Sequence, residues 1–228
     1  MNRRATFSTG QDVSQIFSKN WLVHRITRRY IAGAVRYGRG RMLDVGCGGQ
    51  PYRGLFAPAV SSCVGLDRRG NPDVKGDAQA LPFRAGAFDT ILCGQVLEHL
   101  PEPGRAMAEM GRTLRTGGHL IVTAPHIWGI HEEPHDYYRF TRYGLCHLMR
   151  QAGLEVVEVR AMAGYWVTAG ARFCYYLEVF ERGLLKPLVR LGYGLVQGCA
   201  LVLDRLHRVE GDTWNYLAVG RKPGAKNP

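Results

Sequence analysis

The sequence predicts an α/β fold with a doubly wound, mostly parallel sheet of seven strands and helices on both faces. Short apolar runs alternate with longer segments of helical periodicity, and the first apolar run leads straight into a cluster of glycines beside an acid. The 228 residues are 46% hydrophobic and 21% charged, so the chain can bury a sizeable core as a single globular domain. The strands are expected at residues 41–45, 62–66, about 72–75, 88–93, 119–124, 155–160 and 214–219.

The segments around these strands have the marks of helices. Apolar side chains recur every three to five residues over 11–38, and a helix near 103–115 is expected to close at Gly117-Gly118. Thr141 has the side chain of an N-cap for a helix over 142–152, which Gly153 would end. We therefore expect N-terminal helices over 1–40 as a cap, a core over 41–160, an apolar helical insertion over 161–210 and the last strand and tail over 211–228.

A glycine-rich loop follows the first strand. Gly46, Gly48 and Gly49 lack a Cβ, so the backbone there can take positive φ and let a ligand approach its N–H groups. Asp44 enters the loop from the strand, and the second apolar run ends in Asp67, twenty-one residues after Gly46. That spacing places an acid on a ribose diol in a βαβ unit, so the segment predicts a nucleotide-cofactor loop.

The details of the loop disfavour a dinucleotide. Pro51 stands where the Gly-x-Gly-x-x-Gly fingerprint has its last glycine, and Asp44 would repel a pyrophosphate. The segment Asp-Val-Gly-Cys-Gly instead resembles motif I of the class I S-adenosylmethionine-dependent methyltransferases of the small-molecule type. Their cofactor carries an ammonium and a sulfonium, beside which an acid is expected. A nicotinamide oxidoreductase is the disfavoured alternative.

The resemblance extends over roughly residues 42–159 and implies a Rossmann-like fold with S-adenosylmethionine as cofactor. It implies that Asp67 accepts hydrogen bonds from the ribose hydroxyls, that Asp77 meets the adenine amino group, and that Ala78 supplies a backbone N–H. Gln95 stands where the family touches the cofactor, whereas Cys47 is interpreted as a small residue filling the loop and not as a nucleophile. The implied cofactor residues are Asp44, Gly46, Cys47, Gly48, Gly49, Asp67, Asp77, Ala78 and Gln95.

The loop after the fifth strand carries three histidines, three acids and four aromatic residues over 126–140. Ligands of open α/β sheets bind at the carboxyl ends of strands, so this loop is expected to face the methyl group. His131, Glu132, His135 and Asp136 include metal-ligand types, but Pro134 interrupts their helical spacing and we predict no metal. Two interpretations stay open. His135, with His126 second, is a general base, or the loop is a lid in which His131, Asp136, Tyr137 and Tyr138 shape the substrate pocket.

Residues 161–209 are strongly apolar and aromatic. Their longest uncharged run, 191–203, is thirteen residues, whereas a helix needs roughly 20 to span a bilayer. Arginine and lysine residues border the apolar segments, a pattern typical of an interfacial helix on acidic lipid. A cap over the substrate pocket, a homodimer surface and a peripheral membrane contact all remain open.

Charge and cysteine content limit the partners and the compartment. Thirty Lys and Arg against nineteen Asp and Glu leave a net charge of +11, which favours anionic partners. The basic residues are dispersed and form no RNA-binding module, so nucleic acid is disfavoured. Six scattered cysteines without a Cys-x-x-Cys pair, and an N-terminus without a signal-peptide core, predict a cytoplasmic protein with reduced thiols.

The resemblance implies methyl transfer by in-line displacement, with an oxygen of a small-molecule, glycan or lipid-linked acceptor as the expected target. The stretch from His131 to Thr141 is similar to loops in methyltransferases of surface-glycan and natural-product pathways. One alternative is a catalytically silent cofactor-binding protein that recruits a partner through the insertion. Another is a nucleic-acid methyltransferase, which lacks support because Gly-Gln-Val-Leu at 94–97 replaces the Asn/Asp-Pro-Pro-Tyr/Phe motif.

Overall fold

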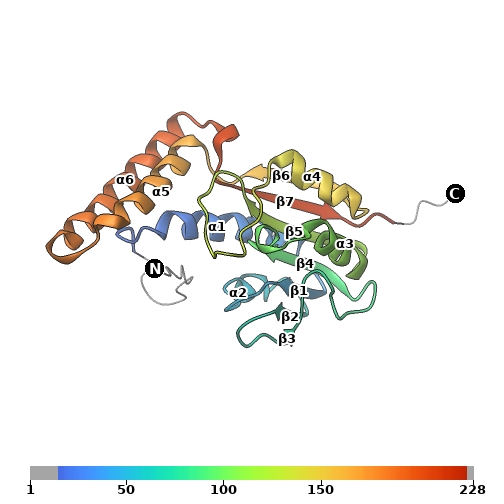
Figure 1. Cartoon of the computed structure of the whole chain (residues 1–228). Coiled ribbons are helices and arrows are strands. Elements are labelled where there is room, and N and C mark those ends of the chain that lie inside the picture. Colours follow the sequence, from blue (N-terminus) through green and yellow to red (C-terminus); the bar gives the residue numbers. More distant parts are fainter. Residues whose placement is uncertain (1–14, 225–228) are drawn as a thin grey trace. The chain divides into compact units, whose positions relative to one another are not determined.

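A computed structural model describes residues 15–224 (Figure 1). The chain divides into two compact units. We call the first the sheet unit; it comprises Ile31–Pro125, Glu132–Arg160 and the chain from Tyr216 onward. We call the second the helical unit; it comprises the chain up to Tyr30, His126–His131 and Ala161–Asn215. The predicted N-terminal helical segment before residue 15, and the tail beyond residue 224, lie outside the described residues.

The seven strands form one sheet in the order β3-β2-β1-β4-β5-β7-β6. The pairs β1·β2, β2·β3, β1·β4 and β4·β5 are all parallel, which confirms the predicted doubly wound α/β sheet. Strand order reverses between β1 and β4, and ligands of such sheets bind in the crevice at that point. The strands are β1 Arg41–Val45, β2 Ser62–Asp67, β3 Val74–Lys75, β4 Phe88–Gly94, β5 Leu114–Pro125, β6 Glu155–Ala161 and β7 Asn215–Arg221.

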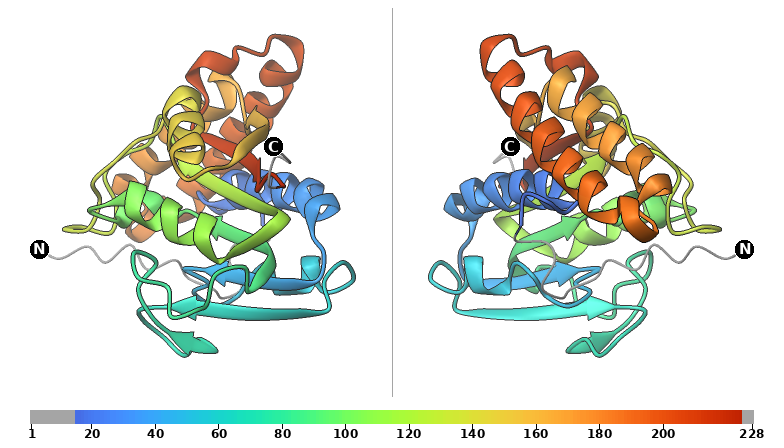
Figure 2. Two further views of the ribbon diagram at one scale, coloured as in Figure 1. Left: turned by 90° about the vertical axis from the view of Figure 1, so that its right-hand side faces the viewer. Right: turned by 90° about the vertical axis from the view of Figure 1, so that its left-hand side faces the viewer.

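The helices of the sheet unit are α2 (Arg53–Phe56), α3 (Pro103–Thr113) and α4 (Arg142–Gln151), with 3₁₀ turns η2 (Val35–Tyr37) and η3 (Leu97–His99). Helix α3 packs on β5 and on α4 (Figure 2). The strands beneath are buried along almost their whole length, as expected when helices cover a parallel sheet. The predicted cap of α4 is confirmed, because the Thr141 hydroxyl accepts the Gly144 N–H at 3.0 Å.

The predicted junction between the third helix and the fifth strand was wrong. Helix α3 ends at Thr113 and β5 begins at once at Leu114, five residues before the predicted start. Leu114 pairs with Phe88. The Gly117 N–H donates to the Lys222 carbonyl, and the Gly118 carbonyl accepts the Lys222 N–H. The two glycines therefore lie inside a strand and not at the end of a helix. A Cβ on Gly118 would come within 2.8 Å of the Asp89 carbonyl oxygen, so glycine is required by close packing.

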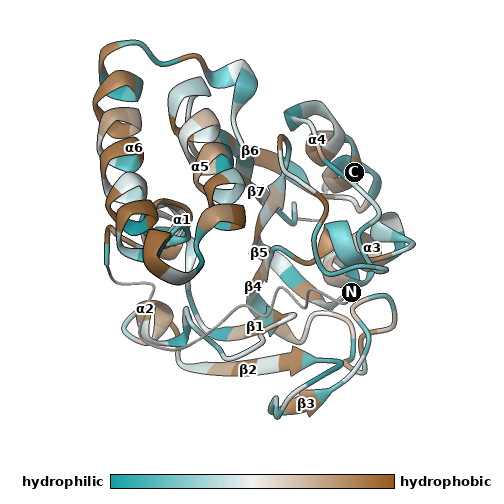
Figure 3. Cartoon of the chain, turned by 60° about the vertical axis from the view of Figure 1, so that its left-hand side comes forward, coloured by the Kyte–Doolittle hydropathy of each residue, from teal (hydrophilic) through white to brown (hydrophobic). Residues whose placement is uncertain are grey.

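The helical unit is built from the first ten residues of α1 (Trp21–Ala34), from α5 (Tyr165–Leu177) and from α6 (Lys186–Leu206). Helices α5 and α6 lie side by side as a helical hairpin and follow β6 and precede β7 in the chain (Figures 1 and 3). Their close approach needs Gly170, because a Cβ there would lie 2.6 Å from the Cβ of Ala200. Short 3₁₀ turns η4 (Glu178–Phe180) and η5 (Gly183–Leu185) connect the two helices, and η6 (Glu210–Asp212) follows α6.

Buried polar side chains hold this hairpin together. The Gln197 carbonyl accepts the Leu22 N–H at 2.9 Å, and its amide donates to the carbonyls of Ile16 and Ser18 at 2.8 and 3.0 Å. The Asp204 carboxylate accepts the Gly164 N–H at 3.1 Å at the start of α5. Each buried polar group of this set therefore has a partner, which keeps its burial inexpensive. None of the described helices is both long and apolar enough to traverse a bilayer.

Candidate functional site

The glycine loop lies at the carboxyl end of β1. Gly46 and Gly48 have φ of 66° and 50°, the left-handed conformation that glycine adopts without strain. The Gly46 and Cys47 N–H groups donate to the Leu66 carbonyl at 2.8 and 3.1 Å, which joins the loop to the end of β2. A Cβ on Gly46 would lie 2.3 Å from Cγ2 of Val96, so no other residue fits there. A Cβ on Gly48 would meet nothing within 4 Å, so that part of the loop faces open space.

Two carboxylates lie at the ends of adjacent parallel strands. Asp67 accepts the Gly48 N–H through one oxygen and the Arg69 N–H through the other, both at 2.9 Å. Asp44 is only 4% exposed, and burial raises the pKa of its carboxyl to about 7, assisted by the negative charge of Asp67 and opposed by Arg53. Two acids that destabilise each other's charge are well suited to a cationic ligand, which would relieve the repulsion.

Cys47 and Gly49 complete the loop in different ways. The Cys47 side chain is buried, and burial, together with the charges of Asp44 and Asp67, raises the pKa of its thiol to about 12. The thiol is therefore protonated at neutral pH, which supports a space-filling role over a nucleophilic one. The lack of a Cβ on Gly65 makes room for it, since a Cβ there would lie 2.8 Å from the sulfur. Gly49 is exposed at the rim of the loop.

The segment after β3 forms a tight turn held by α3. Asp77 accepts the Gln79 N–H through its carboxylate at 2.9 Å, and its carbonyl accepts the Ala80 N–H at 3.0 Å. Ala78 is buried inside this turn. Glu109 of α3 accepts the Leu81 N–H at 2.9 Å, which fixes the turn against the helix. The position of Asp77 is thus determined by tertiary contacts as well as by its own turn.

Gln95 directly follows β4 and has φ of 57°, an uncommon conformation for a residue with a side chain. Its N–H donates to the Thr123 carbonyl and its side-chain amide to the Thr123 hydroxyl, both at 2.9 Å. Backbone strain that neighbours hold in place is often associated with functional sites. Because Val45 aligns with Leu66 and with Cys93, the glycine loop, Asp67 and Gln95 all emerge at the same edge of the sheet.

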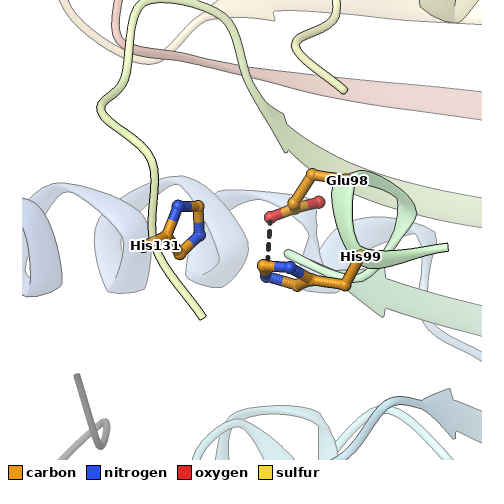
Figure 4. A group of neighbouring side chains, drawn as sticks. All are labelled: Glu98, His99 and His131. Carbon is orange, nitrogen blue, oxygen red and sulfur yellow. Dashed lines mark ion pairs between the residues drawn. The ribbon is translucent and has the colours of Figure 1, made fainter. Parts of the chain in front are cut away.

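One residue near this edge was not selected from the sequence. Glu98, in the turn η3 after β4, is fully buried, and neither carboxylate oxygen has a hydrogen-bond partner among the described residues. Burial raises the pKa of its carboxyl to about 8, while Arg139 opposes the rise. Nε2 of His99 lies 3.8 Å from one of the Glu98 oxygens (Figure 4). The available signal was an acid inside the otherwise apolar stretch Val-Leu-Glu-His-Leu.

The turn η3 also holds part of the long loop after β5. The Glu98 carbonyl accepts the N–H groups of Tyr137 and Tyr138 at 2.8 and 3.3 Å. Nδ1 of His99 lies 2.7 Å from the His135 carbonyl oxygen, and because a carbonyl only accepts, Nδ1 is the donor of this hydrogen bond. The structure therefore brings His135, Tyr137 and Tyr138 to the turn that follows Gln95.

The predicted pocket residues of this loop have distinct surroundings. His135 is exposed, and its Nδ1 lies 3.3 Å from the Tyr137 hydroxyl. Asp136 forms a bidentate ion pair with Arg139 at 2.7 and 2.8 Å, which engages both of its oxygens. Such a pair stabilises the shape of the loop. Tyr138 donates its hydroxyl to the Pro101 carbonyl at 3.0 Å.

His126 and His131 belong to the helical unit, whereas His135 belongs to the sheet unit. The His126 N–H donates to the Trp214 carbonyl at 2.8 Å, and Nδ1 of His131 lies 3.2 Å from the Gly129 carbonyl oxygen. Between them, the Trp128 ring packs edge-on against Tyr175 with centroids 5.0 Å apart. The three loop histidines are thus divided between two units, a division that the sequence did not predict.

Comparison with known proteins shows that this chain is similar to methyltransferases. Residues 43–122 match a methyltransferase domain. The chain is 29% identical to the ubiquinone biosynthesis O-methyltransferase of Aromatoleum aromaticum over 157 residues, which is 54% of this chain and 67% of that protein. The matched domain contains the glycine loop, both strand-end acids, Asp77 and Gln95.

Solved structures share the fold at lower identity. A (4+2)-cyclase, SpnF, superposes with a TM-score of 0.57 and 23% identity over 85% of this chain and 80% of its own. The 1,6-didemethyltoxoflavin-N1-methyltransferase of Burkholderia thailandensis, solved with S-adenosylhomocysteine, superposes with a TM-score of 0.56 and 16% identity over 87% of this chain and 77% of its own. The strand-end acids, the matched domain and the shared fold agree: residues 43–122 form a methyltransferase domain, and the chain is an S-adenosylmethionine-dependent methyltransferase with S-adenosylmethionine as its cofactor.

Proposed function

We propose that the protein methylates an oxygen atom of a small-molecule, glycan or lipid-linked acceptor. The observation that carries the proposal is the pair of acids, Asp44 and Asp67, beside the open side of the glycine loop. Their mutual repulsion favours a cationic ligand over a phosphate. The similarity to an enzyme named as an O-methyltransferase supports oxygen as the acceptor atom.

The proposed cofactor contacts follow from the positions of the side chains. Asp67 would accept the ribose hydroxyls, since each of its oxygens uses one lone pair on the backbone and keeps another. Asp44 would face the ammonium of the amino-acid end, with Gly46, Cys47, Gly48 and Gly49 as the backbone cradle. Asp77 and Ala78 would receive the adenine, and Gln95 would contact the cofactor from the end of β4.

Bound S-adenosylmethionine supplies a methyl group on a sulfonium, which is an activated leaving group for in-line displacement. The chain must hold the acceptor oxygen in line and exclude water. Tyr137, Tyr138, Asp136 and His131 are the proposed pocket residues, and His135 is the proposed base for the acceptor hydroxyl proton. Its exposed ring is free to meet an acceptor from solvent. His126 is the second candidate for that role.

We place the enzyme in the cytoplasm, with the segment 161–209 meeting either a membrane surface or a second subunit. The exposed apolar side chains of that segment support an external contact of this kind. Nucleic acid is not proposed as the acceptor, because the basic residues of the sequence are dispersed.

Transfer of a labelled methyl group tests the proposal. The full chain is incubated with methyl-labelled S-adenosylmethionine and a panel of phenols, catechols, sugars and prenylated phenols, and products are analysed by mass spectrometry. We expect an O-methyl product from at least one acceptor, and a lower kcat at neutral pH for His135→Asn. The matched control is His147→Asn on α4. Because a cyclase shares the fold, turnover has to be measured directly. Cofactor binding without transfer to any acceptor class would contradict the proposal.

A further inference from the structure

The turn between α5 and α6 exposes large apolar side chains. We call residues 179–188 the hairpin tip. Leu184 is 98% exposed, Leu188 64%, Leu185 52% and Phe180 45%. A single exposed leucine needs no explanation, but four neighbouring exposed apolar side chains on one turn indicate an interaction surface. Figure 3 shows this end of the hairpin as hydrophobic.

Aromatic side chains continue the tip along α5. The rings of Phe173 and Tyr176 are stacked with centroids 6.2 Å apart, and Tyr176 meets Phe180 edge-on at 5.8 Å. Phe173 and Tyr176 are 48% and 60% exposed, so this row also faces outward. Tyrosine next to exposed leucine is typical of a surface with one apolar side and one wet side.

The charges around the tip are unequal. Glu178 is paired with Lys19 at 2.5 Å, and Glu181 accepts hydrogen bonds from Arg190 at 2.9 Å and from the Tyr193 hydroxyl at 3.0 Å. The nearby acids are thus neutralised within the helical unit. Arg182 and Lys186 are exposed, and neither makes an ion pair within the part of the chain that the structure describes. The exposed leucines are therefore flanked by uncompensated positive charge.

We propose that the hairpin tip docks on the surface of an anionic lipid bilayer. Leu184, Leu185 and Leu188 enter the boundary between headgroups and acyl chains, while Arg182 and Lys186 bind lipid phosphates. The attachment is peripheral, in keeping with the short apolar run of α6. Resting on the proposed function, this surface narrows the acceptor class to molecules that reside in such a bilayer.

A second copy of the chain fits the tip less well than lipid does. A symmetric dimer through this surface would bring each tip against the same tip of its partner. Arg182 and Lys186 would then face identical cations, with the local acids already engaged by Lys19 and Arg190. Lipid phosphate supplies the missing negative charge.

Co-sedimentation of the full chain with vesicles tests the proposal. Vesicles of phosphatidylcholine with and without phosphatidylglycerol are compared at low salt. We expect binding only when phosphatidylglycerol is present, and a loss of about 30-fold on reversing both charges in Arg182→Glu/Lys186→Glu. The double variant Leu184→Ser/Leu185→Ser should lose about tenfold or more. Leu206→Ser is the matched control, because Leu206 is 77% exposed at the other end of α6.

The results of this experiment distinguish lipid from a second copy of the chain as the partner of the hairpin tip. The proposal would be overturned if the wild type and the double-leucine variant bound equally to the vesicles. It would also be overturned if the wild type bound equally well with and without phosphatidylglycerol. A dimer in light scattering that the leucine variant abolishes, without vesicle binding, would assign the tip to a second copy. Transfer to a water-soluble acceptor is measured in parallel on the same proteins. Methyl transfer without vesicle binding would contradict only the proposed docking surface. Vesicle binding without methyl transfer would contradict only the proposed function.

Discussion

In the sheet unit the unusual side chains are polar and buried, whereas in the helical unit they are apolar and exposed. Asp44 and Glu98 are acids with raised pKa in the interior. Leu184 and Leu188 are leucines in solvent, although Gln197 in the interior of the same unit is fully hydrogen-bonded. Each unit is therefore proposed to bind a different partner: the sheet unit a cationic cofactor beside its acids, and the helical unit an apolar surface at the hairpin tip.

In the sheet unit, the largest effect is expected from adding a side chain to the glycine loop. Gly46→Ala places a Cβ 2.3 Å from Cγ2 of Val96 at a φ of 66°. We expect cofactor affinity to fall by about 100-fold, because the loop must shift away from Val96. Titration calorimetry with S-adenosylhomocysteine measures it. Gly48→Ala is the control, with strain but no clash, and should lose about fivefold. Equal losses in both variants would show that the Val96 contact is irrelevant.

Removal of the hydrogen-bonded side-chain amide of Gln197 should destabilise the helical unit. Gln197→Leu leaves the Leu22 N–H and the carbonyls of Ile16 and Ser18 without their partner. We expect the free energy of unfolding in urea to fall by about 3 kcal/mol. Gln151→Leu, at the exposed end of α4, should change it by less than about 0.5 kcal/mol. A neutral or stabilising Gln197→Leu would mean that the buried network is dispensable.

The raised pKa of Asp44 makes the free energy of unfolding depend on pH. The carboxyl has a pKa of about 7 in the folded state, against an ordinary value of 3.8. The folded state therefore holds a proton that the unfolded state has lost between these values, and the free energy of unfolding falls as pH rises through this window. Above about pH 7 the cost is complete. Asp44→Asn should flatten the fall, and S-adenosylmethionine should bind the wild type more tightly as Asp44 ionises.

Glu98 provides the internal check for that measurement. Its carboxyl has a pKa of about 8 against an ordinary value of 4.5, so its contribution overlaps that of Asp44 and continues to about pH 8. Glu98→Gln should therefore flatten the curve between about pH 7 and 8, where the Asp44 contribution is already complete. Unfolding is followed by fluorescence in urea from pH 5 to 9. Identical curves for the wild type and both variants would contradict the burial of either charge.

The smallest effect is expected at the hairpin tip. Leu184→Ser should change the free energy of unfolding by less than about 0.5 kcal/mol, since the side chain is 98% exposed and packs against nothing it would lose. Val167→Ser, buried in α5, is the contrast and should cost about 2 kcal/mol or more. Substantial destabilisation by Leu184→Ser would mean that this leucine has a partner in the folded chain.

Much of the sheet unit could be predicted from local sequence. Strands such as Arg41–Val45 are short apolar runs, and the glycine loop follows because its conformation depends on residue types close in the chain. The start of β5 was missed because Gly117-Gly118 has the local appearance of a helix end. Its actual conformation depends on pairing with Phe88 and Lys222, which are distant in sequence.

The rest of the site depends on burial, which a single sequence does not show. In the sequence Glu98 has the appearance of an ordinary turn acid, and only the folded structure shows that its carboxyl is buried without a hydrogen-bond partner among the described residues. The division of the loop histidines between two units is likewise a tertiary property. For the apolar insertion, composition predicted an external or capping surface. Which side chains face outward, Leu184 above all, required the helical hairpin itself.

We propose that the acids at the carboxyl edge of the sheet bind the cofactor. Titration calorimetry tests this cofactor binding most directly. S-adenosylhomocysteine is titrated into the wild type, into Asp67→Asn and into Asp89→Asn. Asp89 is the matched acid because it accepts the Arg41 N–H and pairs with Arg115, at the opposite end of β1. We predict a loss of about 30-fold for Asp67→Asn and wild-type affinity for Asp89→Asn. Unchanged affinity in Asp67→Asn would contradict the account.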